Sequence, residues 1–213
     1  KTLPSHTSMI TGVSPAVHKI IWNSWIPFRG VVKVPTIFSI AKANGYSTAL
    51  FATKTKFKHL NVKNSLDKFS LNGQDAIGAA KLAADYLVEK NPNVLFVHLP
   101  DSDSAGHLRR WESNEQLKAL ENVDKAIGIL KKAILNSLKG KTYALIITAD
   151  HGGLGKSHGS SSYDDKTIPW ITWGNIVKQG HDITLPVNTM DSAATVLWLL
   201  NLPTPKNLEG APV

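Results

Sequence analysis

The sequence has no cysteine among its 213 residues, which excludes a disulfide framework. No apolar run approaches the roughly 20 residues that a membrane-spanning helix needs, so no membrane span is expected. We find no internal repeat and no low-complexity tract. The remaining composition, 42% hydrophobic and 19% charged, is that of an ordinary globular protein. We therefore expect a single domain over residues 1–213.

Acidic residues are scarce relative to basic ones. The chain has 16 Asp and Glu against 24 Lys and Arg, a net charge of +8, and such a balance favours anionic substrates or surfaces. The basic residues are scattered, so we expect no binding of a nucleic acid duplex. The densest group is interpreted as a solvated loop rather than a binding site, and it consists of Lys54, Lys56, Lys58 and Lys63.

The spacing of apolar residues predicts alternating helices and strands. Helices are expected at 34–44, 74–90, 113–138 and 189–200, and strands at 46–52, 94–99, 144–148 and 168–173. This alternation predicts a parallel sheet with helices on both faces. The apolar stripe expected on the longest helix consists of Leu117, Leu120, Val123, Ile127 and Leu130. Residues 53–73 are expected to be irregular.

Metal-ligating side chains follow two of the expected strands, in what we take to be loops. The candidates are Asp103 and His107 after the strand at 94–99, and Asp150, His151 and His158 after the strand at 144–148. Open α/β sheets keep their sites just past the carboxyl ends of strands. Carboxylate and imidazole ligands suit zinc first and manganese or iron second. The set therefore predicts a pair of divalent metal ions, which is typical of phosphoryl transfer. Glycines 152 and 153 are expected to let the backbone turn sharply after the second strand.

A short helix is expected over Ser5 to Ile10, with Ser5 as its N-cap. Thr2 lies just before it. A hydroxyl at a helix N-terminus sits in a positive field, and a nearby metal can ionise it to an alkoxide nucleophile. From the residues alone, Thr2 is more simply interpreted as an ordinary turn threonine.

Four motifs in order carry a family resemblance. They read Thr-x-Pro-Ser-His-Thr-Ser-x-x-Thr-Gly from Thr2, Asp-x-x-Gly-His from Asp103, Asp-His-Gly from Asp150, and His-Gly at His158. Together they resemble the alkaline phosphatase superfamily, most closely the type I phosphodiesterase/nucleotide pyrophosphatase family. The match runs from Thr2 to Gly210. It implies a three-layer α/β sandwich, with a mostly parallel sheet and helices on both faces.

The resemblance also implies a role for each matched residue. Thr2 corresponds to the nucleophile, which shares one metal with Asp150 and His151. Asp103, His107 and His158 correspond to the ligands of the second metal, and the spacing of four to the histidine favours Asp103 over its rival Asp101. Asn23 corresponds to an asparagine whose amide stabilises a phosphate oxygen. A cysteine-derived sulfatase nucleophile is excluded because the chain has no cysteine.

The implied activity is two-metal hydrolysis of phosphodiester or pyrophosphate bonds in a small phosphate ester, through a covalent phosphothreonine. Diesters are expected to be preferred, because Asn23 is a neutral donor, whereas a monoester site needs a further cation. The cations close to matched residues in sequence are Lys19, Arg109 and Arg110. Two alternatives stay open: a phosphomonoesterase or phosphomutase of the same superfamily, and a non-catalytic, metal-stabilised binding domain.

Two further expectations come from the resemblance. Family members carry an opening strand that ends in a metal-ligating aspartate before the nucleophile, and we expect this strand to be missing from the sequence, which would make it a fragment. A periplasmic or secreted location is also implied.

Overall fold

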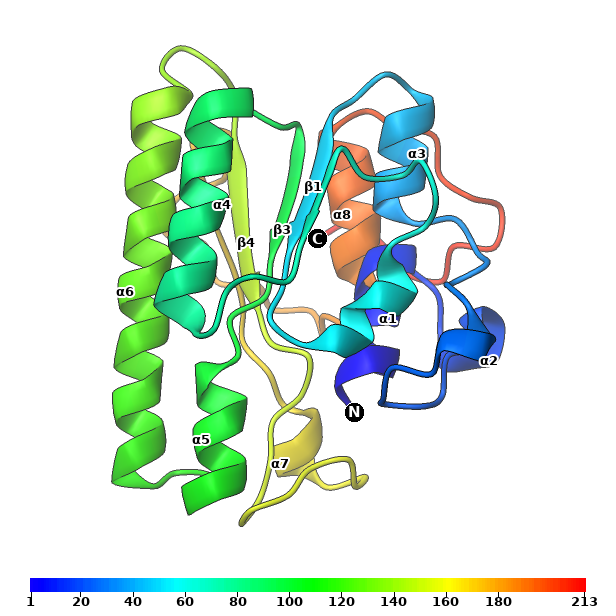
Figure 1. Ribbon diagram of the computed structural model, residues 1–213. Coiled ribbons are helices and arrows are strands. Elements are labelled where there is room, and N and C mark those ends of the chain that lie inside the picture. Colours follow the sequence, from blue (N-terminus) through cyan, green and yellow to red (C-terminus); the bar gives the residue numbers. More distant parts are fainter.

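The computed structural model describes all 213 residues and has three layers, with strands between two groups of helices (Figure 1). Three parallel strands pair in the order β2 (Lys68–Ser70), β1 (Thr48–Phe51), β3 (Val94–Val97). A second, antiparallel pair consists of β4 (Ala144–Thr148) and β5 (Trp170–Gly174). The predicted mixed α/β class with a largely parallel arrangement is confirmed.

Helices cover the strands from both sides. On one side lie α4 (Ala76–Lys90) and α6 (Asn114–Ser137), and on the other lie α1 (Thr2–Thr11), α3 (Ile37–Ala43) and α8 (Asp191–Leu199). The shorter elements are α2 (Pro15–His18), α5 (Asp101–Arg109), α7 (Tyr163–Lys166) and two 3-10 turns, η1 (Pro27–Arg29) and η2 (Thr55–Leu60). None of the helices combines the length and apolar character that crossing a membrane requires.

Strand β1 joins the two halves of the core. Its side chains alternate between faces, as the two-residue period of a strand requires. Ala49 and Phe51 pack in the cluster under α4 and α6, whereas Leu50 and the following Ala52 pack in the cluster with α1, α3 and α8. All four are buried, so β1 is held from both sides and its carboxyl end is a rigid edge for the site.

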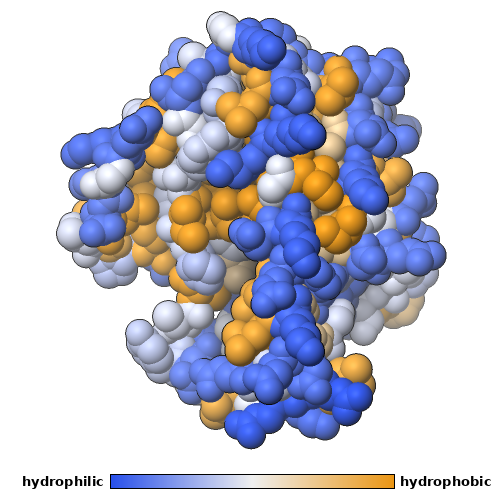
Figure 2. Space-filling model, turned by 90° about the vertical axis from the view of Figure 1, so that its left-hand side faces the viewer, coloured by the Kyte–Doolittle hydropathy of each residue, from blue (hydrophilic) through white to orange (hydrophobic).

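Helix α6 starts as the sequence predicts, because Ser113 caps it by accepting a hydrogen bond from Gln116 N at 3.2 Å. The predicted apolar stripe is partly wrong. Leu130 is buried, together with Ala126 and Ala133, but Leu117 and Leu120 are exposed. The first half of α6 packs against the short polar helix α5, which does not cover those leucines. Figure 2 views the α6 side and shows apolar surface among hydrophilic surface there.

Three local expectations are corrected. Helix α1 begins at Thr2, so Ser5 is not its N-cap; the Ser5 hydroxyl instead donates to the Asp150 carbonyl at 2.6 Å. Asp103 lies on helix α5 rather than in a loop. Residues 53–73, expected to be irregular, contain the 3-10 turn η2 and the edge strand β2.

Candidate active site

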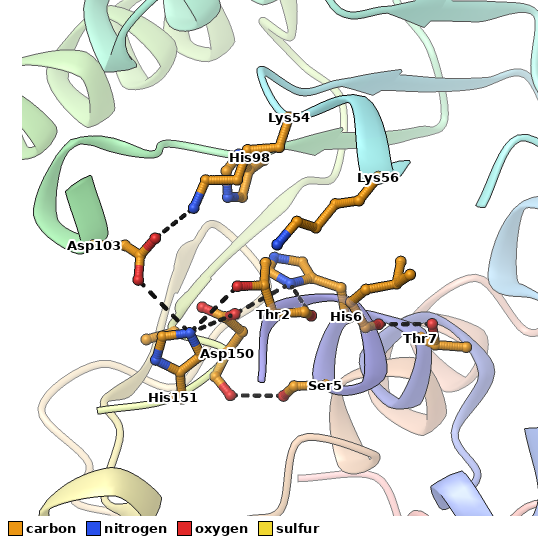
Figure 3. Close-up of polar contacts among 12 residues, drawn as sticks. Thr2, Ser5, His6, Thr7, Lys54, Lys56, His98, Asp103, Asp150 and His151 are labelled. Atoms are coloured by element: carbon orange, nitrogen blue, oxygen red, sulfur yellow. Dashed lines mark hydrogen bonds and ion pairs between the residues drawn. The ribbon is translucent and has the colours of Figure 1, made fainter. Parts of the chain in front are cut away.

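Three chain segments meet at the carboxyl ends of the strands: the first turn of α1, helix α5 after β3, and the loop after β4 (Figure 3). Six of the seven residues singled out from the sequence lie on these segments: Thr2, Asp103, His107, Asp150, His151 and His158. The seventh, Asn23, lies in the loop after α2 and contacts the first turn of α1.

The first group lies around Thr2 at the start of α1. The Thr2 hydroxyl oxygen is 3.5 Å from His151 Nε2, and that nitrogen is 3.2 Å from Asp150 Oδ2. The Ser5 hydroxyl ties the backbone of Asp150 to the same helix. Thr2, Asp150 and His151, the three residues that the resemblance assigns to one metal, therefore lie close together.

The second group lies around Asp103. Its Oδ1 is 3.4 Å from His107 Nε2 and 3.5 Å from His158 Nε2, and the two histidine nitrogens are 3.0 Å apart. Asp103 and His107 are four residues apart on α5, so both project from one face of the helix. His151 links the groups, because its ring stacks on His158 and its Nε2 is 3.8 Å from Asp103 Oδ1.

Two carboxylate oxygens in these groups are buried without a hydrogen-bond partner, Asp103 Oδ1 and Asp150 Oδ2. A buried, unpaired carboxylate oxygen is costly unless a cation satisfies it. Ligand atoms of Asp103, His151 and His158 lie within 4.8 Å of one another, so these three residues, which come from both groups, could hold a single ion. The donor set of oxygen and imidazole nitrogen fits zinc or manganese, and each predicted group supplies one of the orphaned oxygens.

Metal ligation requires ionised carboxylates and neutral imidazoles, and the pKa values of Asp150 and His158 favour these forms. Burial raises the pKa of Asp150, but the neighbouring His6 and His151 outweigh it and hold this pKa well below its usual range. Burial, together with the proximity of His151, lowers the pKa of His158 to about 4. The aspartate is therefore ionised and His158 neutral at neutral pH, with a nitrogen lone pair available.

Asn23 lies against the first turn of α1. Its Oδ1 accepts a hydrogen bond from Leu3 N at 2.9 Å, one residue after the candidate nucleophile. This contact directs the carboxamide toward the Thr2 end of the helix. Asp101, the rival ligand, is engaged elsewhere, because its Oδ1 accepts from Ala76 N at 2.6 Å at the start of α4.

Trp111 packs against the histidine pair, with its ring 5.3 Å from that of His107 and 5.8 Å from that of His158. Two glycines make room for it: a Cβ on Gly106 would lie 2.7 Å from the indole and one on Gly153 only 2.2 Å. Close packing, and not the turn expected from the sequence, is what requires glycine at position 153, since its φ is not positive.

Sequence reasoning missed two residues of the site, Lys54 and Lys56, whereas His6 is the histidine that it placed nearest to Thr2. Lys54 and Lys56 were assigned to a solvated loop, yet Lys54 pairs with Asp103 and Lys56 Nζ is 3.1 Å from Asn23 Oδ1. Burial, followed by the charge of Lys54, lowers the pKa of Lys56. His6 is buried, with Nδ1 2.9 Å from Thr2 O and 3.4 Å from Asp150 Oδ2. The strand-end rule could have found the lysines, since both follow the carboxyl end of β1.

The fold and this cluster define an α/β protein of the alkaline phosphatase superfamily. The profile described as type I phosphodiesterase / nucleotide pyrophosphatase matches residues 1–185. The chain belongs to that family, which supports phosphoester cleavage or phosphoryl transfer as its chemistry.

Individual relatives agree with this placement. A phosphopentomutase of Alkaliphilus oremlandii is 28% identical over 170 residues, 79% of this chain and 40% of the relative. Among solved structures, a 2-O GAG sulfatase has a TM-score of 0.70 at 16% identity over 100% of this chain and 63% of its own. Phosphonate monoester hydrolase from Silicibacter pomeroyi has a TM-score of 0.64 at 14% identity, over 99% of this chain and 66% of its own. The chain spans less than half the length of the phosphopentomutase relative.

Proposed function

We propose that the chain forms the catalytic centre of a two-metal hydrolase that cleaves phosphodiester or pyrophosphate bonds of a small phosphate ester, with Thr2 as nucleophile. The observation that carries the proposal is the position of the Thr2 hydroxyl. It lies at the start of a helix, 3.5 Å from His151 Nε2, beside Asp150 Oδ2, a buried carboxylate oxygen that accepts no hydrogen bond and lies 3.2 Å from the same nitrogen. A periplasmic or secreted location belongs to the same proposal.

The residues of the chain would divide the work as follows. Thr2 Oγ bonds to phosphorus while the bond from phosphorus to the leaving oxygen breaks, and water then cleaves the phosphothreonine and restores the hydroxyl. The N-terminus of α1 favours negative charge on Thr2 and on the phosphoryl group. The Asn23 amide donates to a non-bridging oxygen as charge develops there.

Asp150 and His151, with Thr2, would hold one divalent ion, and Asp103, His107 and His158 the other. When bound, such ions lower the pKa of a hydroxyl and neutralise charge on the phosphoryl oxygens. Lys54 would orient a ligand without touching the metal itself. It pairs with Oδ2 of Asp103, which leaves Oδ1 of that carboxylate facing His107 and His158. Zinc is the proposed metal, with manganese second.

The test is Thr2→Ala, assayed on bis-para-nitrophenyl phosphate with zinc or manganese. We expect turnover to be abolished while at least one metal stays bound. In the parent protein, attack by Thr2 releases one para-nitrophenol and leaves a para-nitrophenyl phosphoryl group on Thr2, which mass spectrometry should detect after rapid quenching. Thr204→Ala, at an exposed threonine, is the matched control and should keep parent activity. Near-parent activity in Thr2→Ala would mean that another group attacks phosphorus.

A second candidate is a phosphomonoesterase or phosphomutase, favoured by the phosphopentomutase relative, which aligns with 79% of the chain. A mutase would pass the phosphoryl group from Thr2 to a second hydroxyl of a sugar phosphate instead of to water. Isomerisation of a pentose phosphate without release of inorganic phosphate would identify it. Metal binding without turnover of any of these substrates would identify the remaining alternative, a binding domain.

A further inference from the structure

Two lysines from the segment after β1, Lys54 and Lys56, reach into the site from the side across from Asp150 and His151. Figure 3 shows Lys54 directed toward Asp103 and Lys56 directed toward Thr2 and His6. Both side chains are partly buried, unlike those of Lys58 and Lys63 in the same segment, which are exposed. The two inward lysines are therefore part of the site's wall and not of a solvated loop.

Their charges are used differently. Lys54 forms an ion pair with Asp103, so its charge is already balanced. Lys56 contacts only a neutral acceptor, Asn23 Oδ1, and forms no ion pair. A partly buried ammonium without an anionic partner is costly, and a bound anion offsets that cost. Lys56 is thus the cation available to a ligand.

The contact with Lys56 also fixes the orientation of Asn23. Oδ1 accepts from Leu3 N and from Lys56 Nζ, and both of these groups can only donate. The amide NH2 is therefore the end of the side chain that remains to donate to a ligand. Lys56 and the Asn23 amide lie side by side as a charged and a neutral donor at the start of α1.

We propose that Lys56 binds a non-bridging phosphoryl oxygen next to Asn23 and extends the substrate range of the site to dianionic phosphate monoesters. A monoester carries nearly two negative charges at neutral pH and a diester one, so a further ammonium distinguishes them. Arg109 and Arg110, the arginines considered from the sequence, are exposed on α5 and its end. The inference rests on the proposed function, because it assigns the phosphoryl group to the Thr2 end of the site.

The experiment compares Lys56→Gln with the parent protein on para-nitrophenyl phosphate and on bis-para-nitrophenyl phosphate. Glutamine removes the charge but keeps an N–H donor for Asn23 Oδ1. Because charge-assisted hydrogen bonds are the strong ones, we expect kcat/KM for the monoester to fall about tenfold to hundredfold, and for the diester by less than about threefold. In Lys56→Arg, the ratio of monoester to diester kcat/KM should stay within about threefold of the parent's ratio. Lys63→Gln should match the parent in kcat/KM on both esters.

Equal losses on both esters would overturn the inference, because they would show that Lys56 only positions Asn23 or supports the fold. Unchanged kcat/KM on both esters would overturn the inference as well. So would a ratio of monoester to diester kcat/KM that falls as far in Lys56→Arg as in Lys56→Gln. A separate readout covers failure of the proposed function. If the parent turns over neither ester, calorimetric titration of the zinc-loaded proteins with inorganic phosphate decides. Phosphate binding that is at least tenfold weaker in Lys56→Gln than in the parent supports the inference. Equal affinity in the two proteins, or no phosphate binding to the parent, refutes it.

Discussion

Binding of divalent metal should stabilise this chain measurably, and removal of one ligand should cancel a defined share of that effect. The perturbation is His158→Ala. His158 Nε2 lies 3.0 Å from His107 Nε2 and 3.5 Å from Asp103 Oδ1, so the substitution removes one of three ligands from the second group. The first group, around Asp150, keeps all of its members.

The magnitude follows from mass action. An ion present at about 100 times its dissociation constant stabilises the folded state by about 2.7 kcal/mol. For a chain of this length, that corresponds to a rise of about 5–11 °C in the unfolding temperature for each site. If loss of His158 weakens the second site a hundredfold, the same zinc concentration contributes only about 0.4 kcal/mol there. The variant should therefore show about half of the parent's zinc-induced shift.

The assay is thermal unfolding of the metal-free protein, with and without zinc, combined with elemental analysis of zinc per chain. Comparing each variant with its own metal-free form removes any direct effect of the substitution on packing. His181→Ala is the control, since His181 is exposed and outside the cluster, and it should shift as the parent does. Equal zinc content and an equal shift in His158→Ala would refute the ligand assignment.

Two further predictions concern the amide donor and the buried histidine at the end of β3. Asn23→Ala removes the amide donor without adding charge beside Lys56, so we expect the activation free energy for the diester to rise by about 2–4 kcal/mol, with kcat lowered more than KM is raised. A change confined to KM in steady-state kinetics would contradict the role. His98 is almost fully buried, and burial, followed by the charge of His6, lowers its pKa well below 6.5. Its unfolded form therefore takes up a proton that the folded form does not, so stability is full above the unfolded pKa and falls with pH below it. Denaturant unfolding of the metal-free protein should show this as a loss of stability as the pH falls from about 7.5 to about 5.5. One such proton can contribute at most about 1.4 kcal/mol over that interval, and His98→Gln should lack its contribution. An identical pH dependence in the variant would show that His98 is not the group responsible.

Much of the fold could be read from local patterns. The strand at 144–148 is where the sequence placed it, and helix α4 ends at Lys90 as expected. Apolar periodicity and capping residues act over a few residues, so they are visible in sequence. The pairing of β4 with β5 in antiparallel orientation was not visible, because register and direction depend on contacts between distant segments.

The candidate ligands were accessible for a similar reason. Asp103 and Asp150 each follow a strand closely, and strand ends in α/β folds meet at one edge. The helix at α5 escaped prediction because its sequence is polar and its mean hydropathy low, which resembles a loop. Its folding nevertheless kept Asp103 and His107 together, because residues four apart share a helix face.

The sequence by itself determined the order of the longer helices and of four of the strands, together with the residue types available to the site, since these depend on residue type and short spacing. Only the tertiary structure decided which charges meet. Lys56 and Asn23 are 33 residues apart, and Lys54 and Asp103 are 49 apart, so no local pattern relates them. Sequence reasoning assigned these lysines to a solvated loop, whereas packing of the segment after β1 against the site turned them inward.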